Sequence, residues 1–121
     1  MTGVHVGDFE SPDETRTPDK TAMDVVRLAD GTTAARLTFQ PGWRWSECIK
    51  PVAGTDSCQA RHVGVAQSGR LVVRHEDGTE LEIATGNAYV IEPGHDAWVV
   101  GDEPYVSFEF ESRAAEEYAR S

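Results

Sequence analysis

The sequence predicts an all-β domain, either a sandwich or a barrel, and three observations support this class. Short apolar segments recur about every 8–12 residues, the spacing of strands in such folds. Turn-forming pairs such as Asp30-Gly31, Pro41-Gly42 and Pro93-Gly94 separate these segments. No long helical pattern alternates with the strands, as a parallel βαβ sheet would require.

The elements follow in order from these patterns. Residues 1–22 are predicted to form an N-terminal arm, because Pro12, Pro18 and their polar neighbours leave little apolar periodicity to bury. One domain, residues 23–121, follows the arm. A short terminal helix is predicted over residues 113–120. The predicted strands cover residues 23–29, 33–40, 43–48, 60–67, 70–76, 80–84, 88–92, 97–100 and 105–111.

Composition and charge narrow the function. The chain has 121 residues and a formal net charge of −10, so it lacks the basic surface that nucleic acid or an anionic membrane would need as a partner. No apolar run reaches the roughly 20 residues that span a bilayer, and the N-terminus lacks the layout of a signal peptide. A cytoplasmic location is therefore expected, with Cys48 and Cys58 as thiols.

The segment from Asp56 to His62 carries candidate metal ligands. Asp56, Cys58 and His62 are separated by two and four residues, and even spacing on an extended strand places all three on one face. A set of one carboxylate, one thiolate and one imidazole contains a thiolate, which favours zinc, ferrous iron or copper over magnesium or manganese. The alternative is that Cys58 is a small buried hydrophobic residue and Asp56 a turn residue.

A hairpin register adds His75 to this set. If Ser68-Gly69 is a two-residue turn, residues 60–67 and 70–76 pair antiparallel and His62 faces His75. The two imidazoles would then share a metal or a proton. Alternatively, His75 is simply exposed at the end of its strand.

The same residues resemble the first motif of the cupin family, in which two histidines separated by one residue precede a glutamate and a glycine. Aligned on Gly69, His62 takes the position of the glutamate, Cys58 that of the second histidine and Asp56 that of the first. The resemblance covers about residues 41–110. It implies a single-domain cupin-type jelly-roll β-barrel (a double-stranded β-helix), here followed by the short C-terminal helix.

The second cupin motif is matched in its glycines. Gly86 stands at its start and Gly94 at its turn, whereas Ala97 stands where the family has a histidine. His95 lies two residues earlier, so in an extended strand its side chain points to the same face as that of Ala97. It either replaces the missing ligand or hydrogen-bonds Asp96 at the surface.

Aromatic residues suggest a substrate pocket. Trp43 and Trp45 alternate on one segment, and Tyr89 and Trp98 flank the second motif. Lining the mouth of a barrel, these four rings would favour a flat organic ligand. The alternative is that they are core residues.

Three functional hypotheses remain open. The first is a metal-dependent enzyme (isomerase, lyase or oxygenase) with a small organic substrate and no organic cofactor. Its divalent ion (zinc, iron, nickel or manganese) would be held by Cys58, His62, His75 and His95. The second is a metal-free cupin that senses a ligand or performs acid/base chemistry, with His62 as the catalytic base. The third is a non-catalytic module that forms a homodimer through apolar outward positions such as Val65.

Overall fold

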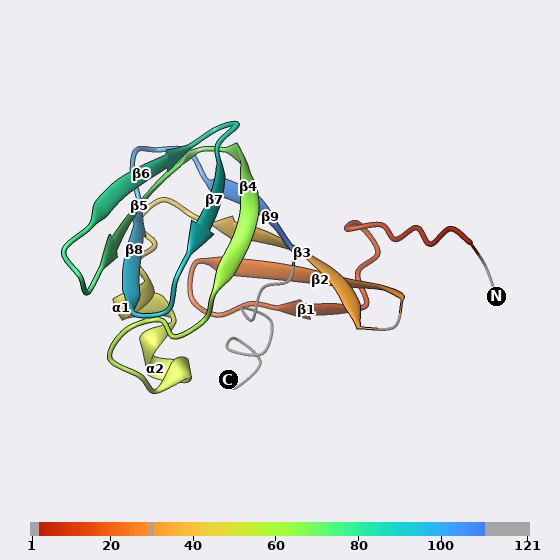
Figure 1. Ribbon diagram of the computed structural model, residues 1–121, viewed down its shortest axis with the longest axis horizontal. Coiled ribbons are helices and arrows are strands. Elements are labelled where there is room, and N and C mark those ends of the chain that lie inside the picture. Colours follow the sequence, from red (N-terminus) through yellow and green to blue (C-terminus); the bar gives the residue numbers. More distant parts are fainter. Residues whose placement is uncertain (1–2, 30, 111–121) are drawn as a thin grey trace.

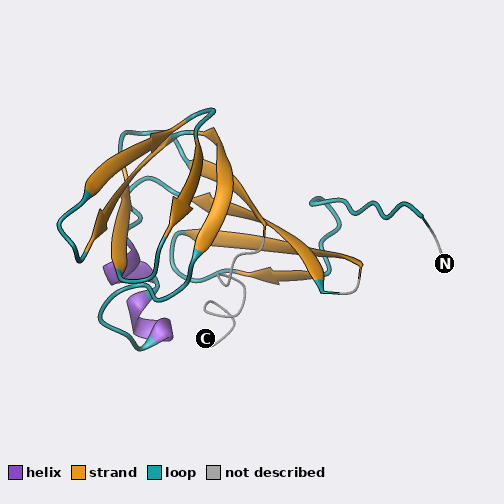
Figure 2. Ribbon diagram, in the orientation of Figure 1, coloured by secondary structure: helices purple, strands orange, loops and turns teal. Residues whose placement is uncertain are grey.

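The computed structural model describes residues 3–29 and 31–110. Over these residues the chain forms nine strands and two short helices (Figures 1 and 2). The elements are β1 (Glu14–Arg16), β2 (Thr21–Ala29), β3 (Thr32–Phe39), α1 (Trp45–Cys48), α2 (Lys50–Ala53), β4 (His62–Ser68), β5 (Arg70–His75), β6 (Glu80–Ala84), β7 (Ala88–Ile91), β8 (His95–Val99) and β9 (Tyr105–Phe110). The all-β class predicted from the sequence is confirmed.

Two antiparallel sheets make up the fold. The larger has the strand order β1-β2-β3-β9-β4-β7, and the smaller has the order β6-β5-β8. The small sheet faces the β9-β4-β7 side of the large one, while β1, β2 and β3 extend beyond it (Figure 1). Strands that follow one another in sequence therefore often lie in different sheets.

The predicted hairpin between residues 60–67 and 70–76 is wrong. β4 pairs with β7 and β9, whereas β5 pairs with β6 and β8. Gly69, at φ +80°, lies where the chain crosses from one sheet to the other, and a Cβ there would clash with the backbone of Pro104. A glycine is needed here because the backbone has positive φ where the chain passes between the sheets. A hairpin turn also favours glycine, so the sequence alone does not distinguish the two.

The predicted strand over residues 43–48 is also wrong, because α1 begins at Trp45. Trp45, Cys48 and Ile49 are buried, and this spacing of three and four residues is helical rather than extended. α2 follows directly and ends at Gly54, which has the left-handed conformation typical of a helix C-terminus. The predicted helix over residues 113–120 lies outside the described residues.

Aromatic rings fill much of the interior between the sheets. Trp43 stacks on Phe39 with ring centroids 3.8 Å apart, and its Nε1 donates a hydrogen bond of 2.9 Å to Thr21 Oγ1. Trp45 and Tyr105 are almost completely buried beside them. Burial of each such side chain contributes about 1.5–3 kcal/mol or more, so these rings anchor this end of the barrel.

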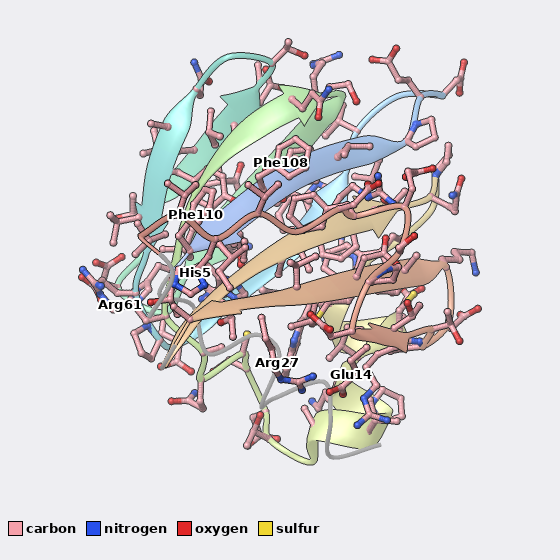
Figure 3. All side chains as sticks on the ribbon, turned by 90° about the vertical axis from the view of Figure 1, so that its right-hand side faces the viewer. His5, Glu14, Arg27, Arg61, Phe108 and Phe110 are labelled. Carbon is pink, nitrogen blue, oxygen red and sulfur yellow. The ribbon has the colours of Figure 1, made fainter. Side chains whose placement is uncertain are left out.

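The outer face of the large sheet carries an apolar strip. Phe108 and Phe110 lie along β9 on this face (Figure 3), and Phe9, from the N-terminal segment, packs on Phe108 with ring centroids 5.2 Å apart. Val65, Val90 and Phe110 remain exposed. Of residues 1–22, Glu14–Arg16 forms β1 and pairs with β2. In the described part of the chain no helix has the length and apolar character to cross a membrane.

Candidate functional site

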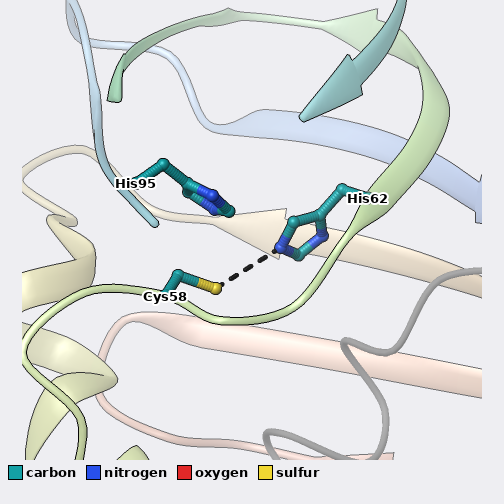
Figure 4. A group of neighbouring side chains, drawn as sticks. All are labelled: Cys58, His62 and His95. Carbon is teal, nitrogen blue, oxygen red and sulfur yellow. Dashed lines mark hydrogen bonds between the residues drawn. The ribbon is translucent and has the colours of Figure 1, made fainter. Parts of the chain in front are cut away.

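Cys58, His62 and His95 form a buried cluster inside the barrel (Figure 4). One ligand atom from each, the Cys58 sulfur and a ring nitrogen of each histidine, lies within 4.8 Å of the others. Cys58 precedes β4, His62 is the first residue of β4, and His95 is the first residue of β8. The cluster therefore joins the two sheets.

Backbone hydrogen bonds hold the two halves of the cluster together. The Cys58 N–H donates to the carbonyl of His95 at 2.7 Å, and the Gly94 N–H donates to the carbonyl of Cys58 at 2.7 Å. This isolated bridge fixes the start of β4 against the start of β8. The thiol and the His95 ring are thus positioned by main chain rather than by flexible side-chain contacts.

Each histidine is oriented through its Nδ1. His62 Nδ1 lies 2.8 Å from Glu109 Oε1, and His95 Nδ1 lies 2.8 Å from the carbonyl oxygen of Glu92. A carbonyl and a carboxylate accept hydrogen bonds, so both rings donate through Nδ1 and point Nε2 into the cluster. His62 Nε2 is 3.6 Å from Cys58 Sγ, and the two imidazole rings meet edge to face with centroids 5.2 Å apart.

The charges of the cluster depend on one another. Burial raises the pKa of the Cys58 thiol, but hydrogen bonds from His62 and His95 outweigh it and bring this pKa down to about 7. Burial lowers the pKa of His62, whereas the Glu109 carboxylate and Cys58 raise it, to about 10. The sulfur therefore has strong thiolate character, which is the form that binds metals or attacks electrophiles.

Glu109 is a site residue that the sequence patterns did not reveal. It is only 3% exposed, and besides His62 it binds Tyr89, whose hydroxyl donates to Glu109 Oε2 at 2.6 Å. Burial and the Glu109 carboxylate both raise the pKa of Tyr89, so the phenol stays protonated. Phe108 and Phe110 flank it in sequence, and the alternation of β9 places Glu109 on the inner face, opposite to both rings.

A small cavity lies beside the cluster. Its volume is about 20 Å³, enough for about one water molecule. Trp43, Trp45 and Tyr89, three of the four predicted pocket residues, line it together with His62 and His95. The buried Trp45 Nε1 has no hydrogen-bond partner among the described residues, so the cavity wall offers an unused donor.

Trp98 does not line this cavity. Along β8, His95 and Ala97 face the interior of the barrel. Side chains alternate along a strand, so Trp98 points to the outer face. Its ring stacks under the Arg44 guanidinium, 4.3 Å from the ring centroid. The structure therefore places Trp98 in a surface cation–π contact.

A larger cleft opens between the edge strands β6 and β7. Its volume is about 670 Å³, within the range of small-molecule sites. Tyr89 and Ile91 line both this cleft and the small cavity, so these two residues form the wall between the cleft and the cluster.

The structure does not bring His75 to the cluster. The prediction that His62 faces His75 is wrong, since His62 pairs with Ile91 in β7. His75 lies at the rim of the cleft, where its Nε2 donates to the Pro93 carbonyl at 2.8 Å and its Nδ1 accepts the Asp77 N–H at 3.0 Å. Both ring nitrogens are engaged with backbone groups, which leaves neither for a metal.

Asp56 also lies away from the cluster. Its side chain is fully exposed and is 3.7 Å from Lys50 Nζ. The backbone around Asp56 forms bends rather than a strand. Side chains two residues apart share a face only in an extended strand, so Asp56 and Cys58 do not point the same way. Of the predicted ligands, Cys58, His62 and His95 are the three that the structure places together.

Comparison with solved structures identifies the fold. KdgF from a Halomonas species is similar with a TM-score of 0.60 and 17% identity, covering 90% of this chain and 92% of that one. A Klebsiella pneumoniae protein with a double-stranded β-helix domain gives 0.58 and 13%, covering 87% and 81%. A DUF1255 protein from Acidithiobacillus ferrooxidans gives 0.57 and 18%, covering 92% and 98%.

No family model and no curated protein matches the sequence. The structural likeness shows the fold, which is the cupin-type double-stranded β-helix expected from the two motifs.

Proposed function

We propose that this cupin-type barrel is a metal-dependent enzyme that acts on a small organic substrate, with Cys58, His62 and His95 as metal ligands. One observation carries the proposal: both histidines donate through Nδ1 to fixed oxygen acceptors, so both Nε2 atoms converge on the Cys58 sulfur. Histidines that bind metals in proteins are oriented in this way by their second nitrogen.

The donor set selects the metal. One thiolate and two imidazoles match zinc, copper or ferrous iron, whereas manganese and magnesium prefer oxygen ligands. Three protein ligands are the number found at catalytic zinc, where the remaining position takes water or substrate. A metal ion would replace the proton that Cys58 Sγ and His62 Nε2 share, as expected for a site whose loading releases protons.

The surrounding residues have distinct roles in this proposal. Glu109 fixes the tautomer of His62 and supplies the negative charge that makes the ring a stronger ligand. Tyr89 in turn fixes Glu109, and the rings of Trp43 and Trp45 restrict the water beside the cluster. A bound ion would polarise a carbonyl or activate water, chemistry that serves isomerases, lyases and oxygenases alike.

A second candidate uses the same residues without metal. The order Cys58–His62–Glu109 has the relationships of a nucleophile, a base and an orienting carboxylate. Against it, Cys58 is completely buried and does not line the small cavity, so an electrophile there would meet His62 and His95 rather than the sulfur. A catalytic triad would also give His95 no role, whereas a metal site uses it as a ligand. The metal site is therefore favoured.

Metal analysis separates the two candidates. Protein purified without a His-tag, stripped with chelator and reloaded, should bind about one equivalent of zinc or cobalt. The cobalt form should show a thiolate-to-metal charge-transfer band. Cys58→Ser should abolish this band, whereas Cys48→Ser, the matched change at the other buried free thiol, should leave it intact.

A folded protein that binds no metal under these conditions would contradict the metal proposal. Rapid alkylation of Cys58, prevented by His62→Ala, would then favour the nucleophile.

A further inference from the structure

The cleft between β6 and β7 has an apolar floor. Leu81 and Ile83 from β6 and Tyr89 and Ile91 from β7 line it, together with Val73 from β5. Leu81 alternates along β6 with the outward-facing Glu80 and Glu82, so its side chain points into the cleft. It is nevertheless 67% exposed. An exposed leucine in a concave site is a surface that a ligand would cover.

The charged groups around this floor are almost all negative. Asp77 and Glu92 line the cleft, Glu82 borders it with its side chain on the outward face of β6, and within residues 3–29 and 31–110 no lysine or arginine lines it. Arg70 pairs with Glu82 at 2.8 Å and Arg61 with Glu92 at 3.1 Å, and both ion pairs are partly exposed to solvent. A ligand carboxylate in the cleft would therefore meet no free cation, in a protein that already carries a net charge of −10.

Two side chains separate the cleft from the small cavity beside the cluster. Tyr89 and Ile91 form the shared wall, and the cavity behind them has room for about one water. A ligand seated on the apolar floor would therefore reach the cluster only with a small head group that passes Tyr89.

We infer that the cleft binds an uncharged organic molecule with an apolar body, which extends one small metal-binding head group past Tyr89 and carries no carboxylate. The inference rests on the proposed metal site and adds the class of ligand. The apolar body is selected by the floor, and carboxylates are rejected because the rim offers them only acidic or already paired groups.

A matched pair of thiols tests this inference on the cobalt-loaded protein. Benzyl mercaptan and 4-(mercaptomethyl)benzoate have the same head group and ring and differ in one carboxylate. The uncharged thiol should change the cobalt spectrum at a concentration about tenfold lower than the carboxylate. Equal or tighter binding of the carboxylate would overturn the inference.

Methyl NMR shows where the probe binds and does not depend on the metal. Signals of Ile83 and Ile91 should shift with benzyl mercaptan in both metal-loaded and metal-stripped protein. If cobalt binds but these methyl groups do not respond, the ligand assignment fails while the metal site stands. If cobalt does not bind but the methyl groups respond, the metal site fails and the cleft assignment stands.

A charge placed in the cleft sharpens the test. Leu81→Lys should reduce the preference for the uncharged thiol to about twofold or reverse it, because the lysine would pair with the carboxylate. Val6→Lys adds the same charge at an exposed position of the N-terminal segment, which does not line the cleft, and should leave the preference unchanged. A preference that moves equally in both variants would show that net charge, not the cleft, decides it.

Discussion

Substitution of Glu109 by glutamine should weaken metal binding without unfolding the barrel. The carboxylate accepts hydrogen bonds from His62 Nδ1 at 2.8 Å and from the Tyr89 hydroxyl at 2.6 Å. Glutamine has nearly the same shape, but its amide has one oxygen that accepts and one NH₂ that donates. Its oxygen can accept from His62 Nδ1, but its NH₂ then lies where the carboxylate accepted from Tyr89, and the phenol must turn its own hydrogen to another acceptor.

The magnitude follows from the role of Glu109 behind His62. Loss of a residue that orients a metal ligand typically reduces metal affinity about 10–100-fold, or about 1.4–2.7 kcal/mol. Glu109 is buried and carries the charge that holds the His62 ring, so Glu109→Gln should fall in the upper half of this range. Tyr89→Phe removes only the second hydrogen bond and should cost less, about tenfold or below.

Competition with a chromophoric chelator at fixed pH measures the zinc dissociation constant of each variant. Glu92→Gln is the matched control, because its exposed side chain pairs with Arg61 while its backbone carbonyl continues to accept from His95. A dissociation constant for Glu109→Gln within about twofold of the parent would refute the assigned role. Equal weakening in Glu92→Gln would refute it as well, since charge alone would then account for the effect.

Three other outcomes are expected. His95→Ala should reduce zinc affinity at least as much as Glu109→Gln, whereas His75→Ala, at the rim of the cleft, should leave it unchanged in the same chelator assay. Gly64→Ala should lower the free energy of unfolding by about 1–3 kcal/mol or more in urea titrations, because its Cβ would clash with a backbone oxygen of β9; an unchanged midpoint would contradict the packing described. Thr21→Val should cost about 1–3 kcal/mol by leaving the buried Trp43 N–H without an acceptor, while Thr21→Ser should retain most of the stability, and equal stability of the two would argue against this hydrogen bond.

Local patterns were sufficient for the fold class. Gly31 and the pair Pro93-Gly94 lie between strands as expected, and both glycines have positive φ. Apart from residues 43–48, the segments predicted as strands are strands with nearly the predicted bounds. These signals are local, and each depends on a few adjacent residues.

Strand pairing could not be predicted in the same way. Ser68-Gly69 resembles a hairpin turn, but the partners of β4 are β7 and β9, which come later in the chain. Those choices depend on the closure of the whole barrel, which one turn does not encode. The error in pairing placed His75 opposite His62 and thus added a residue to the predicted site.

The candidate site was predicted in part for the same reason. Cys58 and His62 were found because they are near in sequence, and His95 because it shares the facing of Ala97 in the second motif. Glu109 was missed because its approach to His62 depends on the pairing of β4 with β9. One signal was available in the sequence: Glu109 stands between two phenylalanines on a predicted strand, so it points to the opposite face from both.

The bridge between Cys58 and His95 has a consequence for the kinetics of folding. It joins the two sheets through residues far apart in sequence, and contacts of this kind form late because loop closure must come first. A metal ion at this seam would tie the sheets together after the folding transition state has passed. We therefore expect metal to slow unfolding while leaving the folding rate nearly unchanged, so that it would prolong the lifetime of the closed barrel.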